Sequence, residues 1–143
     1  MLRSLRLVSL FILLLASHLK GFSQNDVLLY PDSVDQRVRY EIKIEMPKAY
    51  VSGLLIMHKP SDSLVNASIV NEFGISLMDF TYNEIKDKVK FHSLTDKLNK
   101  WYIRKTLGND LKKVLKSMKE GSTECTNNKR KIKYSFHLAN ELE

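Results

Sequence analysis

The histidines are the first residues to consider for chemistry, because a neutral imidazole can transfer protons or bind a metal ion near neutral pH. Beyond residue 23 the chain has His58, His92 and His137. None of them has another His, Cys or acidic residue at the spacing typical of a metal site. Each lies near the end or on the polar face of an expected strand, which favours a solvated surface histidine. The sequence therefore predicts no metal site.

The other reactive side chains are equally isolated. Cys125 is the only cysteine, so a disulfide framework and a CxxC redox pair are excluded. In an oxidising compartment this thiol either forms an intermolecular disulfide or stays free. Glu72 lies beside Gly74 in an expected turn, where a carboxylate is usually solvated. Because the sequence has no G-x-S-x-G motif, phosphate loop or dinucleotide fingerprint, we expect no catalytic residues, no cofactor and no enzymatic activity.

The N-terminal residues 1–23 have the three parts of a secretory signal peptide. Two arginines precede a mostly apolar stretch at 7–16, and small residues at 21 and 23 fit cleavage near Ser23/Gln24. A membrane anchor needs about 20 apolar residues, whereas His18 and Lys20 end this stretch earlier. We expect an exported protein in the bacterial periplasm or at the periplasmic face of the outer membrane.

Charge is distributed unevenly along the 143-residue chain. Residues 24–80 contain 5 basic and 8 acidic groups, whereas residues 81–143 contain 15 basic and 8 acidic groups. Nucleic acid is a poor explanation of this basic half in an exported protein. An anionic membrane surface or an acidic envelope protein fits it better.

The elements that must position these groups are mainly strands. Residues 24–35 read as a linker or N-terminal arm, and from residue 36 apolar and charged residues alternate with the period of a half-buried strand. The segment 54–57 is apolar on both faces, which is typical of a central strand, and 59–62 reads as a turn. The expected strands are 36–46, 50–58, 64–70, 75–82, 88–92 and 132–138, with Cys125 in a loop over 121–128.

A helical segment lies between the last two of these strands. Ser93 and Asp96 resemble a capping box, and apolar residues between 103 and 118 fall within about 120° of helical arc. The opposite side carries lysines, namely Lys105, Lys112, Lys113, Lys116 and Lys119. Upstream apolar residues fall on that lysine side, namely Leu94, Leu98, Trp101 and Tyr102. The helix therefore breaks near Gly108 or just before Ile103, or has two apolar surfaces.

Consecutive strands without intervening helices predict an antiparallel arrangement. We expect residues 36–143 to form a single α+β domain, in which a curved antiparallel sheet, an open half-barrel, has the helical segment packed on one face. Strand surface that is apolar on both sides belongs to a deep core or lines a cavity for an apolar ligand.

The order of leader, antiparallel strands, helical segment and return strand resembles the LolA/LolB-like group of bacterial lipoprotein carriers and receptors. The segment 49–82, with Asn71-Glu72-Phe73-Gly74-Ile75 inside it, also resembles small exported bacterial proteins related to that group. The likeness covers roughly residues 36–138 and, with six expected strands, indicates a half-size variant. It implies an unclosed barrel capped by helices, whose hydrophobic cavity takes acyl chains. The cavity-facing residues that it implies are Leu55, Met57, Met78, Phe80 and Trp101.

Two functional hypotheses follow. In the first, the protein is a non-enzymatic binding protein for an apolar or lipidated ligand in the cell envelope. In the second, it is a structural or interaction subunit of an envelope assembly, and a partner protein covers the same apolar surface. In either case the five lysines are the expected contact with an anionic membrane surface or an envelope protein.

Overall fold

The structure is a computed structural model that describes residues 30–139. The expected leader and its cleavage site, and residues 24–29 of the expected arm, lie outside the described residues. Within them, Tyr30 is buried in the core, and the backbone N–H of Asp35 donates a hydrogen bond to the carbonyl of Lys59 at 2.7 Å. The described part of the arm is therefore docked on the sheet.

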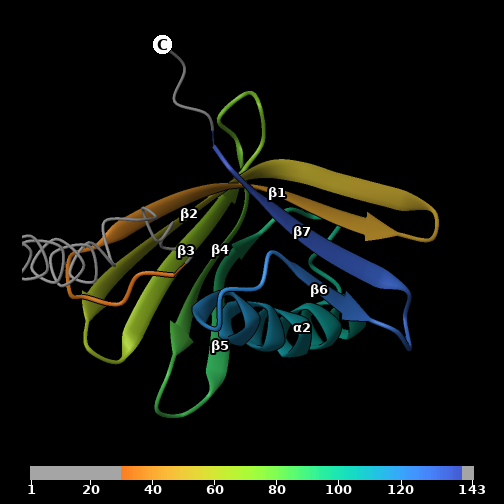
Figure 1. Cartoon of the computed structure of the whole chain (residues 1–143). Coiled ribbons are helices and arrows are strands. Elements are labelled where there is room, and N and C mark those ends of the chain that lie inside the picture. Colours follow the sequence, from red (N-terminus) through yellow and green to blue (C-terminus); the bar gives the residue numbers. More distant parts are fainter. Residues whose placement is uncertain (1–29, 140–143) are drawn as a thin grey trace, which may run out of the picture.

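Seven antiparallel strands form one curved sheet, with helix α2 (Trp101–Lys119) on its concave face (Figure 1). The strands are β1 (Arg37–Met46), β2 (Ala49–Ser61), β3 (Leu64–Val70), β4 (Ser76–Asn83), β5 (Lys88–Leu94), β6 (Glu124–Asn127) and β7 (Ile132–Leu138). Their order is β5-β4-β3-β2-β1-β7-β6, so β2 is central, as its apolar composition predicts. The helix contacts both edge strands, β5 and β6, and spans the open side of the sheet. The predicted α+β half-barrel is confirmed.

The alternation of β1 explains how the sheet acquires two different faces. Tyr40, Ile42 and Ile44 are each 2% exposed on the concave face, while the intervening residues carry charge on the outer face. Their partners on β2 and β7 follow the same alternation, since Tyr40 pairs with Leu55 and Ile42 with Phe136. Burial of such side chains is the main stabilising contribution, about 1.5–3 kcal/mol for each.

The helix begins later than its sequence signals suggest. Ser93 belongs to β5 and pairs with Asp79 of β4, so the expected capping box does not form. The N-cap residue is Lys100, whose side chain makes no capping hydrogen bond. The helix then runs unbroken through Gly108 to Lys119. Leu94 lies in β5 and Leu98 precedes the helix, which removes the apparent conflict between two apolar stripes.

Two further boundaries differ from expectation. The expected turn at 59–62 is partly strand, because β2 continues to Ser61 through a register shift after His58. The expected loop around Cys125 contains the short strand β6, so the sheet has seven strands instead of six. β6 is short and polar, and its pairing with β7 gives it strand structure that hydrophobic periodicity does not signal.

Candidate functional site

The strongest candidate for a binding site is the apolar interior between the concave face of the sheet and α2. The helix contributes Leu107, Leu111, Val114, Leu115 and Met118, each at most 6% exposed. Three methionines from different elements belong to this core, namely Met57 of β2, Met78 of β4 and Met118 of α2. Methionine side chains are flexible and polarizable, so they repack around varied apolar shapes more readily than branched residues do.

Four of the five residues expected to face a cavity share this interior. Leu55, Met57, Met78 and Phe80 are each at most 1% exposed, and they pack in the same core as the apolar side of α2. Trp101 does not join them, because it is 77% exposed in the first turn of the helix. Its placement among the cavity-facing residues is therefore corrected. The ligand-binding role of the other four stays a prediction, and it requires α2 to move.

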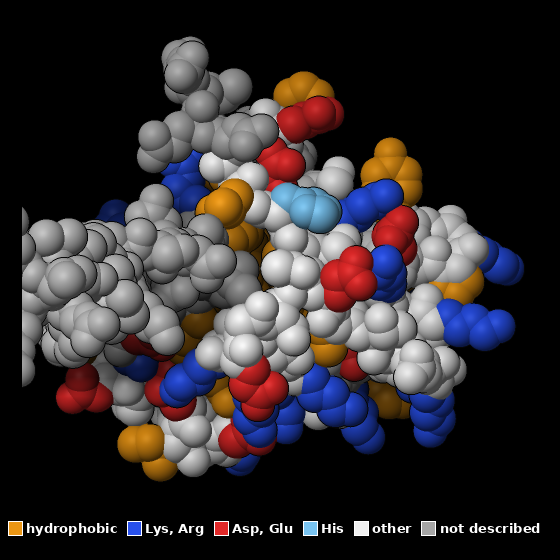
Figure 2. Space-filling view, viewed as in Figure 1, with side chains coloured by type: hydrophobic (Ala, Val, Ile, Leu, Met, Phe, Trp, Pro, Cys, Tyr) orange, Lys and Arg blue, Asp and Glu red, His pale blue; other side chains and the backbone are white. Residues whose placement is uncertain are grey.

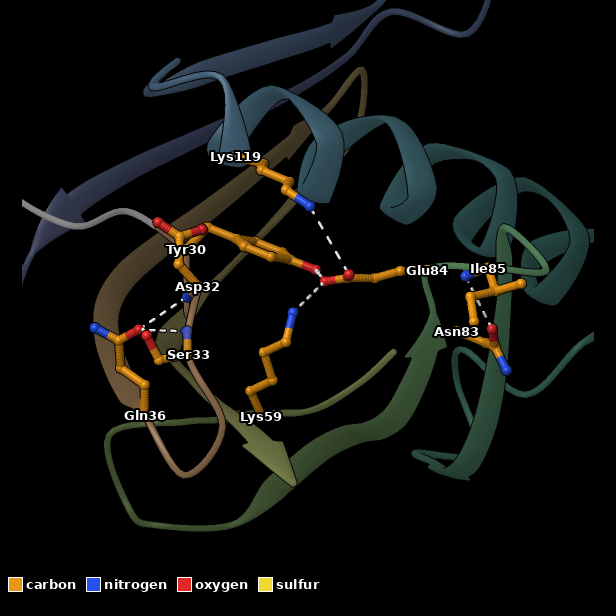
Figure 3. A network of polar contacts seen from close by, with 9 residues as sticks. All are labelled: Tyr30, Asp32, Ser33, Gln36, Lys59, Asn83, Glu84, Ile85 and Lys119. Atoms are coloured by element: carbon orange, nitrogen blue, oxygen red, sulfur yellow. Dashed lines mark hydrogen bonds and ion pairs between the residues drawn. The ribbon is translucent and has the colours of Figure 1, made fainter. Parts of the chain in front are cut away.

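One end of the interior is fastened by the Glu84 cluster, defined here as Tyr30, Lys59, Glu84 and Lys119 (Figure 3). Tyr30, 2% exposed, donates a hydrogen bond from its hydroxyl to Glu84 Oε1 at 2.5 Å. Lys59 Nζ donates to the same oxygen at 3.0 Å, and Lys119 Nζ lies 3.8 Å from Oε2. The cluster thus joins the N-terminal arm, the end of β2, the β4–β5 turn and the end of α2.

The cluster is electrostatically matched to a charged Glu84. Burial alone raises the pKa of the Glu84 carboxyl, but hydrogen bonds from Tyr30 and Lys59 lower it, and the charges of Lys59 and Lys119 lower it further. The net pKa of Glu84 therefore lies below its usual value. Burial and the neighbouring carboxylate raise the pKa of the Tyr30 hydroxyl, so it remains a donor.

A second fastening, the Asp110 cluster, joins the middle of α2 to β6 and β7. Asp110 is 4% exposed and accepts a hydrogen bond from the Tyr134 hydroxyl at 2.7 Å and from Asn127 Nδ2 at 2.8 Å. Burial and the Asp110 carboxylate raise the pKa of Tyr134. A helical carboxylate held by two neutral donors is an arrangement that hydrophobic periodicity does not reveal, so the sequence pattern did not predict it.

The outer face of the sheet holds the other polar groups. A hollow of about 310 Å³ lies over β2–β5 and is lined in part by His58, Asn66, Ser68, Asp79 and His92. Thr81 Oγ1 donates to Asn66 Oδ1 at 2.8 Å and lies 2.7 Å from His92 Nε2. Both carboxylate oxygens of Asp79 accept from serine hydroxyls, one from Ser68 and one from Ser76. The contacts of Ser68 with Asp79, and of Thr81 with Asn66 and His92, join neighbouring strands and form cross-strand ladders.

A second outer hollow of about 730 Å³ is lined by residues of the β3–β4 turn and of β1 and β2. Glu72 of that turn and His137 of β7 line it, together with Tyr50, which is 68% exposed. Asn71 shapes the turn, because its side-chain oxygen accepts from the backbone N–H groups of Phe73 and Ile75. The hollow has a mixed polar and apolar lining and is open to solvent, which distinguishes it from the closed interior.

Cys125 lies on the strand β6 opposite Tyr134, half-buried against the core. The free thiol and the intermolecular disulfide both stay predictions. Within residues 30–139, no group of three or more His, Cys, Asp or Glu side chains is placed to hold a metal ion. No helix of this range is long and apolar enough to cross a membrane.

Comparisons with protein-family models, with curated proteins and with solved structures found no match to this chain. The relationship to the LolA/LolB-like group therefore stays a prediction.

Proposed function

We propose that the protein is an exported binding protein that holds an apolar or lipidated ligand between its sheet and α2, in the bacterial cell envelope. The observation that carries the proposal is the way in which the half-barrel is closed. No strand joins edge strands β5 and β6 within residues 30–139, and α2 spans the gap between them. Displacing this one element exposes the apolar concave face without breaking a strand pairing.

The interior is suited to a ligand of variable shape. Met57 and Met78 on the sheet belong to the same core as Met118 on the helix, and all three are at most 1% exposed. When the helix moves away, a ligand acyl chain would contact these flexible side chains in its place. The apolar surface of the sheet would therefore stay buried. The resemblance to the LolA/LolB-like group supports the same ligand class.

The two polar clusters set how easily the helix leaves. The Glu84 cluster holds its C-terminal end to the arm and the β4–β5 turn, and the Asp110 cluster holds its middle to β7. Tyr30→Phe removes one contact of the Glu84 cluster without adding volume. It should speed ligand entry while the apolar interior remains intact.

The alternative function is that of a structural or interaction subunit. It is favoured by exposed apolar side chains on and beside the larger outer hollow, namely Tyr50, Phe73, Ile75 and Leu138. Such residues on a polar surface are typical of protein contacts. In this role the partner covers the outer face, and the interior stays closed.

Native mass spectrometry of protein purified from its own envelope separates these functions. Co-purifying lipid supports the carrier, whereas a stoichiometric protein partner without lipid contradicts it. Uptake of a fluorescent fatty acid gives a second measurement. The wild type should bind the probe, Tyr30→Phe should bind it faster, and Tyr50→Phe should behave as the wild type because Tyr50 lies on the outer face. Folded protein that takes up no probe would contradict the proposal.

A further inference from the structure

The solvent-facing side of α2 gathers cationic and aromatic residues on one surface. At 100° per residue, its five lysines, Trp101 and Tyr102 fall within about 120° of arc, opposite the buried stripe. We name this surface the basic face, and its residues are Trp101, Tyr102, Lys105, Lys112, Lys113, Lys116 and Lys119. Figure 2 shows Lys and Arg side chains along the lower edge of the molecule, where α2 and the β4–β5 hairpin lie in Figure 1.

The charge of this region is not balanced by its own acids. Between Glu84 and Lys119 the chain has 11 Lys and Arg against four Asp and Glu. Glu84 is bound to Tyr30 and Lys59, and Asp110 is 4% exposed against Tyr134. Two of the four carboxylates are thus committed to internal contacts, which leaves the surface more positive than the count suggests.

The five lysines differ in their partners. Lys116 Nζ lies 2.9 Å from Asp87 Oδ2, and Lys119 contacts Glu84 at 3.8 Å. Lys105, Lys112 and Lys113 have no ion-pair partner among residues 30–139, and Lys105 and Lys113 are exposed. Lys112 also interacts electrostatically with Asp87, so Lys105 and Lys113 are the two cations available to an external anion without loss of an internal contact.

Exposed apolar groups stand at both ends of the basic face. At its start, Trp101 and Tyr102 are 77% and 46% exposed and meet edge to face, with ring centroids 5.9 Å apart. Near its other end, Ile85 is 82% exposed on the β4–β5 turn, whose Asp87 pairs with Lys116. Amphipathic aromatic rings beside lysines suit the headgroup level of a bilayer.

We propose that the basic face docks the protein on an anionic phospholipid bilayer, with the lysines at the headgroups and Trp101 at the interface. The buried stripe stays on the sheet, so the helix touches the bilayer without inserting its apolar side. The docking surface and the ligand interior are opposite sides of one helix. In an extension that rests on the proposed function, headgroups compete with Glu84 for Lys119 and with Asp87 for Lys116. Docking thereby weakens the contacts that hold the C-terminal end of α2, where the ligand would enter.

Trp101 provides a direct measurement, because it is the only tryptophan in the chain. Its emission should shift to the blue when phosphatidylglycerol-containing vesicles are added at low salt, and pure phosphatidylcholine vesicles should leave it unchanged. Binding should weaken steeply with salt, since the screening length falls from about 30 Å at 0.01 M to about 10 Å at 0.1 M. Circular dichroism should show that the helix content is unchanged.

The test variant is Lys105→Glu with Lys113→Glu, which leaves both polar clusters untouched. Its affinity for anionic vesicles should fall by about five-fold or more for each lysine replaced. The matched control is Arg37→Glu with Arg39→Glu, which makes the same change in net charge at exposed positions on the outer face of β1. All variants keep the same N-terminal residues, so any contribution of the leader is common to them. The control should retain vesicle binding.

Several results would overturn docking. They are equal binding to neutral and anionic vesicles, no binding to anionic vesicles at low salt, and a loss of vesicle affinity in the control variant as large as in the test variant. A Trp101 shift with polyglutamate but not with anionic vesicles would also overturn it, and would assign the face to an acidic protein partner. Fatty-acid uptake in solution is measured without vesicles, so failure of docking and failure of the proposed ligand site are distinguishable.

Discussion

Tyr30 and Glu84 lie 54 residues apart in sequence, yet the hydroxyl of one donates a 2.5 Å hydrogen bond to the carboxylate of the other. The contact ties the N-terminal arm to the turn between β4 and β5, beside the end of α2. A segment that reads as a linker is thereby part of the core, since Tyr30 is 2% exposed. The arm is a structural element of the closed interior.

Tyr30→Phe should destabilise the protein by about 1–3 kcal/mol, because the partly buried Glu84 carboxylate loses a hydrogen-bond donor while the ring is retained. The free energy of unfolding, measured with urea, checks this value. Tyr50→Phe removes a hydroxyl from a side chain that is 68% exposed and should change the stability by less than about 0.5 kcal/mol. Equal stability of wild type and Tyr30→Phe would show that the arm is not held by this contact.

Glu84→Gln should cost about 3 kcal/mol or more, because Lys59 is 5% exposed and loses its anionic partner. The double variant Glu84→Gln with Lys59→Met should recover part of that loss, since it removes the unpaired buried charge. The free energy of unfolding in urea, measured for the wild type, Glu84→Gln and the double variant, checks this prediction. A double variant less stable than Glu84→Gln alone would contradict the idea that the uncompensated Lys59 charge causes the damage.

The same carboxylate makes stability depend on acidity. The pKa of Glu84 is lowered from 4.5 in the folded state, so the folded protein binds its proton less readily than the unfolded chain does. Its contribution is complete above about pH 4.5 and is lost as the pH falls through the lower folded pKa. Unfolding curves recorded between neutral and strongly acidic pH should therefore show a loss in the wild type that is reduced in Glu84→Gln. A slope that is identical in both proteins would exclude Glu84 as a source.

Two glycines should respond to alanine in opposite directions. At Gly53 a Cβ atom would lie 2.3 Å from the backbone oxygen of Val70, so Gly53→Ala forces the central strands apart and should destabilise strongly. At Gly108 the nearest atom is Phe91 Cε2 at 3.6 Å, an ordinary contact. Gly108→Ala should therefore stabilise the helix by about 0.5–1 kcal/mol. Thermal unfolding of the pair measures both, and a stabilising Gly53→Ala would contradict the close approach of β2 and β3.

Regular periodicity made most of the fold predictable. The alternation of β1 and the helical stripe ending at Met118 each reflect a single buried face, so local sequence determines them. The start of α2 was mispredicted because Ser93 has a better role in β5, opposite Asp79, than as a helix cap. β6 was missed because a four-residue polar strand depends on its neighbour β7 alone.

The candidate site was less predictable because it depends on contacts between distant residues. The inner positions of Leu55 and Met78 follow from strand alternation, whereas the exposure of Trp101 depends on where the helix begins. Asp110 reads as a polar break in an apolar stripe, and only the fold reveals that Tyr134 and Asn127 bind it. A buried acid among helical apolar positions is the signal that could have indicated such a contact.

The strand order also constrains when the molecule can fold. β1 to β5 are joined in sequence, so each can pair with its predecessor as the chain emerges. β7, by contrast, pairs with β1, and their register joins Ile44 to Tyr134 across about 90 residues of chain. Until the last strand has been synthesised, β1 lacks a neighbour on one side and its loop cannot close. The seven-stranded sheet therefore cannot be completed until synthesis has passed β7, even though β1 to β5 can pair earlier.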